Sequence, residues 1–222
     1  MSLVHSIMRD GLPLGRLFRI PVTINPSLIP IAVLLALGIG RGLEFGFIAN
    51  ASIAAVMVVV VFGSILLHEL GHALVARRFG IETRTINLHL FGGVAQIMRE
   101  PARPAEEFWI AVAGPAVSLG IAALLAVAAV AAALVLPDTS AGHMIITPVV
   151  GGMVANGMLG VFNLLPGYPM DGGRIVRAWL WHRSGDLVRA TIVAATVGEW
   201  VGFALIGVGV VRWLVFGDPG GI

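Results

Sequence analysis

Apolar segments long enough to cross a membrane constrain the fold of this chain more than any other feature. The hydrocarbon core of a bilayer is about 30 Å thick, and a helix crosses it with about 20 apolar residues. Such segments occupy residues 28–40, 52–79, 108–136, 144–165 and 187–216. The first is short for a span, so we expect it to borrow flanking residues or to tilt less than the others. The pattern predicts an all-α polytopic membrane protein with about five transmembrane helices.

The composition agrees with a membrane setting, because 58% of the residues are hydrophobic and only 12% are charged. We expect residues 1–222 to form one transmembrane domain built from packed spans. The chain has no cysteine, which excludes disulfides and thiolate metal sites. The isoelectric point near 10.4 reflects arginines at the membrane boundary, so we expect a lipid bilayer and no nucleic acid as partner.

The arginines also predict the orientation, since basic residues are enriched in cytosolic loops. A five-span arrangement leaves only Arg41 and Arg212 on one side. The other side holds Arg9, Arg16, Arg19, Arg77, Arg78, Arg84, Arg99, Arg103, Arg174, Arg177, Arg183 and Arg189. We therefore predict a multi-pass protein of the cell membrane with a cytosolic N-terminus and an outer C-terminus.

Residues 83–98 differ from the apolar segments around them. They carry β-branched residues in partial alternation, interrupted by Gly92 and Gly93. This pattern is typical of extended chain. We expect a small β-hairpin at the membrane surface.

His68, Glu69 and His72 form a His-Glu-x-x-His pattern inside the second apolar segment. Residues four apart lie on one face of a helix, so both histidines can bind one metal ion while Glu69 polarises a bound water. Ionisable side chains at this depth are costly in lipid and should face the protein interior. The alternative is a set of buried polar residues satisfied within the core. Because the second segment runs inward, His68 should lie nearer the cytosolic face.

The end of the fourth segment is a second unusual feature. Residues 163–174 read NLLPGYPMDGGR, and their prolines and glycines break any helix. Broken backbone at membrane depth is tolerated only where it is enclosed by protein or lines a watery cavity. Asp171 can supply a third metal ligand there, or it can cap a helix that begins at the loop exit.

Three motifs together resemble the site-2 protease family of intramembrane zinc metalloproteases. They are HELGH at residues 68–72, AGPAVS at 113–118 and NLLPGYPMDGGR at 163–174, and they occur in the family's order. The segment GRLFRIPVTINPS at 15–27 resembles the branch without an inserted PDZ domain.

The resemblance implies that His68, His72 and Asp171 hold one Zn²⁺ ion whose fourth position is filled by water. Glu69 would act as general base, and Asn163 would steady the substrate carbonyl or its oxyanion. A hydrogen bond that ties the kinked fourth segment is an equal alternative for Asn163. The implied activity is hydrolysis of peptide bonds within transmembrane segments of other membrane proteins. The extended segment at 83–98 would then hold unwound substrate by main-chain pairing, or serve only as a connection.

The family also has a sixth span, often followed by a regulatory tail, and we expect both to be missing after residue 216. We interpret Gly114 and Ser118 as packing residues and Asn156 as a partner in a structural interhelical bond. Glu199, the isolated charge of the last segment, is assigned to a gate or cavity. Two other functions stay open: a membrane zinc hydrolase of lipids or prenylated peptides, and a metal or ion transporter.

Overall fold

The computed structural model describes residues 11–89 and 92–217. The elements in this part of the chain are β1 (Leu12–Leu17), β2 (Ile20–Ile24), α2 (Leu28–Arg41), α3 (Phe47–Arg78), β3 (Thr83–His89), β4 (Gly92–Ile97), α4 (Pro104–Val135), α5 (Ser140–Asn163), α6 (Asp171–Ser184) and α7 (Leu187–Phe216). The chain divides into two compact units. Unit 1 comprises Met1–Glu100 and Ala113–Gly160, and unit 2 comprises Pro101–Val112 and Val161–Ile222. The division falls inside α4 and α5, which contribute to both units.

Among the described residues, four helices are long and apolar enough to cross a membrane, namely α3, α4, α5 and α7. They confirm four of the five predicted segments. The first predicted segment is helical too, but α2 has only 14 residues. At 1.5 Å per residue it extends for about 21 Å, which is less than the hydrocarbon thickness. The mostly helical fold class is confirmed.

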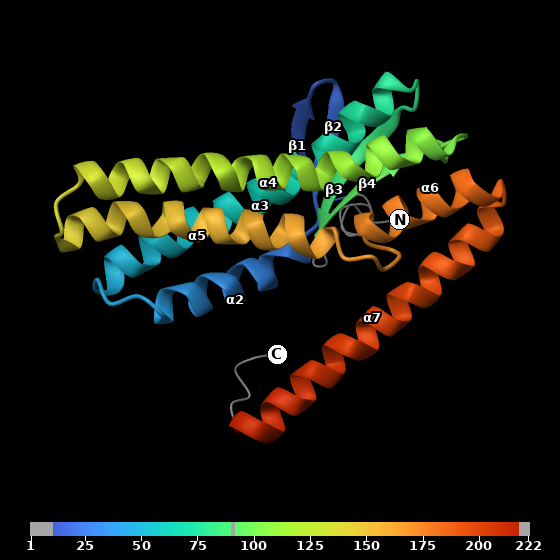
Figure 1. The fold of residues 1–222 in the computed structure, drawn as a ribbon. Coiled ribbons are helices and arrows are strands. Elements are labelled where there is room, and N and C mark those ends of the chain that lie inside the picture. The colour runs from blue at the N-terminus through green and yellow to red at the C-terminus, as the bar shows by residue number, and fades with distance from the viewer. Residues whose placement is uncertain (1–10, 90–91, 218–222) are drawn as a thin grey trace, which may run out of the picture. The chain divides into compact units, whose positions relative to one another are not determined.

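Small residues bring the helices of unit 1 into close contact. A Cβ added at Gly71 of α3 would lie 3.0 Å from the carbonyl oxygen of Ala113 in α4. On α5, a Cβ at Gly160 would lie 2.7 Å from Cγ of Leu119 in α4. Larger side chains at these glycines would push the backbones apart. In Figure 1 the long helices of this unit lie side by side, with α2 beside α3.

A four-stranded sheet in the order β1-β2-β3-β4 adjoins one end of α3 (Figure 1). The predicted hairpin is confirmed by the antiparallel pairing of β3 with β4, although residues 90 and 91 at its tip lie outside the described residues. The hairpin is only half of the sheet, because β2 pairs in parallel with β3 and β1 pairs with β2. Ile20 and Ile86 from the sheet form a buried cluster with Leu70 and Ala73 of α3. This cluster fixes the sheet against the helix that carries the histidines.

Unit 2 contains a helix that the apolar segments did not predict. Helix α6 starts directly after the Pro- and Gly-rich loop and ends at Gly185, which has the left-handed φ of 70° that glycine favours. Asp186 then caps α7 by accepting a hydrogen bond from the backbone N–H of Arg189 at 3.0 Å. Gly198 of α7 allows close approach of the loop, since an added Cβ would lie 2.7 Å from the carbonyl oxygen of Tyr168.

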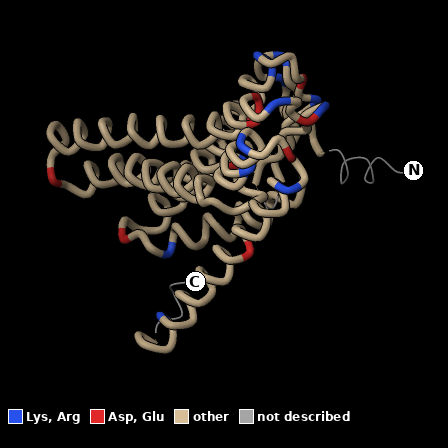
Figure 2. The backbone as a smooth tube through the Cα atoms, turned by 45° about the vertical axis from the view of Figure 1, so that its right-hand side comes forward, with Lys and Arg blue, Asp and Glu red and all other residues tan. Residues whose placement is uncertain are grey.

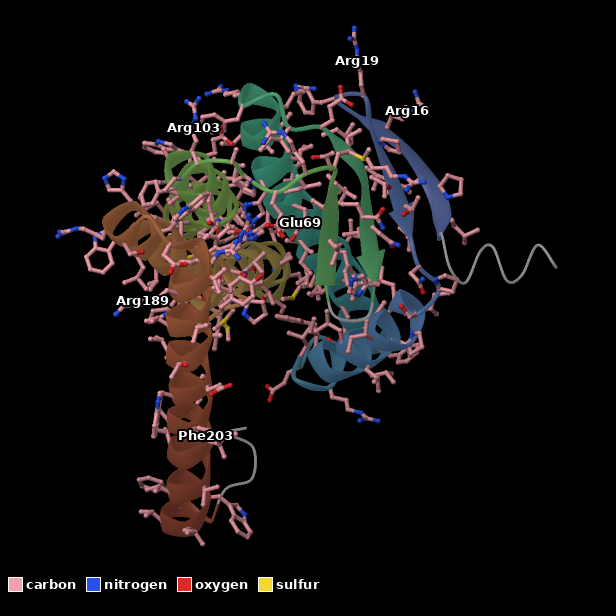
Figure 3. The ribbon with its side chains drawn as sticks, turned by 90° about the vertical axis from the view of Figure 1, so that its right-hand side faces the viewer. Arg16, Arg19, Glu69, Arg103, Arg189 and Phe203 are labelled. Atoms are coloured by element: carbon pink, nitrogen blue, oxygen red, sulfur yellow. The ribbon has the colours of Figure 1, made fainter. Side chains whose placement is uncertain are left out.

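The charged residues of unit 1 are unevenly distributed (Figure 2). Arg16 lies near the end of β1 and Arg19 in the β1–β2 turn, and Figure 3 labels both. Arg77 and Arg78 end α3 beside the sheet, whereas Arg41 is at the far end of α2. Arg9, which the predicted orientation also uses, lies outside the described residues.

Candidate metal centre

His68 and His72 lie one turn apart on α3 and are both buried, with exposures of 3% and 4%. Their rings are 4.9 Å apart between centroids and inclined at 78°. The ligand nitrogens of the two rings lie within 4.8 Å of each other, so one ion can reach both. The helical spacing in the sequence is therefore realised as a pair of imidazoles that share one face.

Ser118 of α4 contacts the imidazole ring of His68. Nδ1 of His68 lies 2.9 Å from Oγ of Ser118, at hydrogen-bond distance. With Nδ1 in this contact, Nε2 is the ring nitrogen that we expect to bind a metal, as is usual when the other nitrogen of a histidine ligand is hydrogen-bonded. Ser118 is fully buried, as expected for a packing residue, and its hydroxyl group also contacts a histidine of the candidate site. The sequence does not predict this contact, because a small residue four positions after a glycine is also typical of helix packing within a membrane.

Gly114 of α4 lies close to the Nε2 atoms of both histidines. A Cβ built at this position would lie 2.5 Å from Nε2 of His68 and would also clash with Nε2 of His72. The absent side chain thus lets the α4 backbone lie close to two imidazole nitrogens, a donor set that zinc prefers. The residues of unit 1 fit a zinc ion, and the prediction that Gly114 permits close approach is confirmed.

Glu69 lies between the histidines in sequence and contacts the hairpin. Its Oε2 accepts a hydrogen bond from the backbone N–H of Ala95 in β4 at 3.3 Å. Gly93 in the same strand is equally close, since a Cβ there would lie 2.5 Å from Cγ of Glu69. Figure 3 shows Glu69 beside this hairpin. Strand β4 therefore orients the carboxylate proposed as general base.

The remaining predicted site residues belong to unit 2. Asp171 is the first residue of α6, follows the N-cap Met170, and is 6% exposed. The N-cap of α6 is therefore Met170, and the alternative prediction that Asp171 caps the helix is wrong by one residue. Nη1 of Arg174 lies 3.5 Å from Oδ1 of Asp171. Asn163 is the last residue of α5 and is half-buried.

Other polar residues that stand out in the sequence or the structure are not among the predicted site residues. Nδ2 of Asn156 donates to Oγ of Ser64 on α3 at 2.8 Å, which confirms the interhelical bond. Glu199 is exposed on α7. Sequence reasoning missed a buried ion pair between Glu107 of α4 and Arg177 of α6, because neither residue belongs to a recognisable motif.

Comparisons with known proteins agree with this architecture. The pattern of peptidase family M50 matches residues 56–139 and 131–206, so the chain belongs to peptidase family M50. Among solved structures, a site-2 protease from Methanocaldococcus jannaschii is similar, with a TM-score of 0.62 and 29% identity over 92% of this chain and 87% of that one.

Two relatives bear names that assign them to the zinc metalloproteases. Rip3 of Mycobacterium tuberculosis is 38% identical over 97% of this chain and 55% of its own length. MJ0392 of Methanocaldococcus jannaschii is 32% identical over 86% of this chain and 52% of its own length. The chain thus spans about half the length of the curated relatives it matches.

Proposed function

We propose that this chain is an intramembrane zinc endopeptidase that hydrolyses peptide bonds within transmembrane segments of other membrane proteins. The observation that carries the proposal is a buried His68–His72 pair on a membrane-length helix, with Glu69 beside it and Gly114 close to both ring nitrogens. Membership of a peptidase family and the names of the relatives support it.

The proposed ligands of the ion are His68, His72 and Asp171. All three side chains are buried, where an ionisable group needs a partner to offset its desolvation. When bound, zinc would polarise a water molecule and lower its pKa to about 7. The chain itself orients the His68 ring through the contact of Nδ1 with Ser118 and offers nitrogen and carboxylate donors.

Glu69 is proposed to take a proton from the attacking water and to return one to the leaving amine. The hydrogen bond from Ala95 to Oε2 supports this role, because it holds one carboxylate oxygen and limits rotation of the group. We propose that Asn163 steadies the substrate carbonyl.

A substrate strand could pair with the edge of β4, which ends the sheet within the described residues. This arrangement would bring an extended peptide close to Glu69, since β4 itself contacts that residue. A helical segment encloses its carbonyl groups, so we expect helix-destabilising residues near the cut. Replacing those substrate residues with leucine should slow cleavage, and an unchanged rate would count against the requirement for unwinding.

The membrane orientation follows from the arginine distribution. We propose that the sheet end of unit 1 faces the cytosol, with the N-terminus on that side and the metal centre nearer to it. We also propose that residues 1–222 act as one protease domain.

The deciding experiment measures bound metal and proteolysis together in detergent-purified protein. We expect about one zinc per chain in the wild type and in Glu69→Gln, and its loss in His68→Ala and Asp171→Ala. Glu69→Gln should abolish cleavage of a transmembrane substrate while it keeps the metal. A folded wild type that binds no supplied zinc would refute the proposal.

Two rival functions predict different results from the same variants. A transporter would show metal flux in vesicles and no hydrolysis by the wild type. A lipid or prenyl-peptide hydrolase would turn over a small amphiphile at a rate independent of helix stability in protein substrates.

A further inference from the structure

A buried ion pair in unit 2 has no part in the proposed chemistry. Glu107, in the first turns of α4, is 1% exposed, and the side chain of Arg177 on α6 is 13% exposed. Nε of Arg177 donates to Oε1 of Glu107 at 2.6 Å, and Nη2 contacts the same oxygen. The pair joins two helices that are distant in sequence.

The same guanidinium group also contacts the loop before α6. Its central carbon lies 5.0 Å from the centroid of the Tyr168 ring, a cation–π distance. The backbone of Tyr168 is in turn held by α7, because its N–H donates to the carbonyl oxygen of Ala194 at 3.4 Å. Arg177 therefore links α4, α6 and the loop through one side chain.

These contacts bracket Asp171 along the chain. Tyr168 lies three residues before it and Arg177 six residues after it, about 9 Å along the helix axis. Asp171 is the first residue of its helix, a place where helices fray and the backbone amides lack internal partners. Its direction therefore depends on what holds the loop and the first turns of α6.

Stability alone is a poor explanation for the pair. Buried ion pairs gain little over well-packed apolar residues, because both charges lose their hydration. Their better-attested use is to specify one arrangement among several. In unit 2, the Glu107–Arg177 pair would specify how the loop before α6 packs against that helix.

We propose that Arg177, held by Glu107, is a positioning residue that fixes the Tyr168 loop and the start of α6, and thereby the direction of the Asp171 carboxylate. The inference rests on the proposed role of Asp171 as a zinc ligand. Arg177 touches neither substrate nor metal in this assignment. Its effect is indirect, as with residues that orient metal ligands from outside the coordination sphere.

The first test compares zinc affinity among Glu107→Gln, Tyr168→Leu and the wild type, by competition with a chelator. We expect about tenfold to hundredfold weaker binding in both variants. Arg183→Met is the matched control, because Arg183 also lies on α6 and stacks on an aromatic ring, that of Trp179 at 5.3 Å. The control should bind zinc as the wild type does. Wild-type affinity in both Glu107→Gln and Tyr168→Leu would overturn the proposal.

Replacing zinc with cobalt gives a measurement that does not change when the fold is merely less stable. The visible spectrum of bound Co²⁺ reports ligand geometry, so it should change in Tyr168→Leu at a temperature where the variant is fully folded. An unchanged spectrum in every folded variant would contradict the positioning role.

A metal-free readout separates this inference from the proposed function. The chain contains no cysteine, so a nitroxide can be attached uniquely at Leu164→Cys, an exposed position at the start of the loop. In metal-free protein, Glu107→Gln should increase nitroxide mobility, while Arg183→Met should leave it unchanged. Unchanged nitroxide mobility in Glu107→Gln would overturn the proposal that the ion pair holds the Tyr168 loop in place. Absence of zinc from the wild type would instead overturn the proposed function, and the mobility comparison would still decide the anchoring.

Discussion

Oγ of Ser118 lies 2.9 Å from Nδ1 of His68, although the two residues are 50 positions apart on different helices. The contact orients the imidazole through Nδ1, so Nε2 is the nitrogen proposed to bind a metal. We predict that Ser118→Ala weakens zinc binding about tenfold to hundredfold, as measured by chelator competition. Ser52→Ala is the control, because Ser52 is exposed on α3 and bonds only to the carbonyl oxygen of Ile48 in its own helix. Equal affinities in the two variants would contradict a role for the contact.

Gly114 provides a second prediction, since its missing side chain allows α4 to approach the histidine nitrogens. Gly114→Ala should abolish measurable zinc binding, because the new Cβ would occupy the space that the ion requires. Gly120→Ala, six residues later in α4, has no atom within 4 Å of the added Cβ. That control should keep zinc and gain about 0.4–1 kcal/mol of stability. Retention of zinc by Gly114→Ala would show that the metal binds elsewhere in the protein.

Gly93 separates catalysis from metal binding. A Cβ at this position would meet Cγ of Glu69 at 2.5 Å, and the flexible carboxylate side chain would have to move. We predict that Gly93→Ala retains zinc while kcat for cleavage falls by about 10²-fold, as expected when a general base is misplaced. Gly63→Ala on α3, with open space around its Cβ, should retain full activity. A fall in zinc content parallel to activity would argue instead for a general disruption of the centre.

The bond between Asn156 and Ser64 makes a testable contribution to helix packing. Nδ2 of Asn156 donates to Oγ of Ser64, which itself donates to the carbonyl oxygen of Val60 at 2.7 Å. A double-mutant cycle with Asn156→Ala and Ser64→Ala should give a coupling free energy of about 0.6 kcal/mol, the average for such bonds in membrane proteins. Reversible unfolding in mixed micelles measures it. A coupling free energy of zero would mean that the two side chains act independently.

The proposed orientation can be tested with single cysteines, because the chain has none of its own. Arg84→Cys on β3 and Asp138→Cys between α4 and α5 are both exposed positions. In inside-out vesicles, a membrane-impermeant maleimide should label the first and spare the second. In right-side-out vesicles the pattern should reverse. The opposite result in both preparations would invert the topology.

The sequence predicted those parts of the fold that depend on local length and hydrophobicity. The four long helices follow from continuous apolar runs, and the β3–β4 hairpin follows from alternation around Gly92 and Gly93. Helix α6 was missed because its arginines and tryptophans give no apolar run, although Asp171 at its start and Gly185 at its end are usual boundary signals. The parallel pairing of Val22 in β2 with Ile86 in β3 is a non-local event, so the sequence did not predict that the hairpin belongs to a larger sheet.

The same distinction between local and non-local information applies to the candidate site. Helical spacing alone identified His68, Glu69 and His72, since all three lie on one turn of one helix. Ser118 and Ala95 could not be assigned their contacts, because a serine in a span and a backbone amide in a strand carry no signature of their partners. Glu107 and Arg177 form a pair only after α4 and α6 are folded, and nothing in their spacing predicts it.

The parallel pairing of β2 with β3 has a consequence for the order of assembly during synthesis. Val22 pairs with Ile86, so α2 and α3 must both be made, and must both return to the same membrane surface, before this ladder can close. Such long-range closure is slow compared with helix formation. Ala95, which holds Glu69, leaves the ribosome later still. A nascent chain would therefore have its histidine helix in the bilayer well before strand β4 can hold the carboxylate of Glu69.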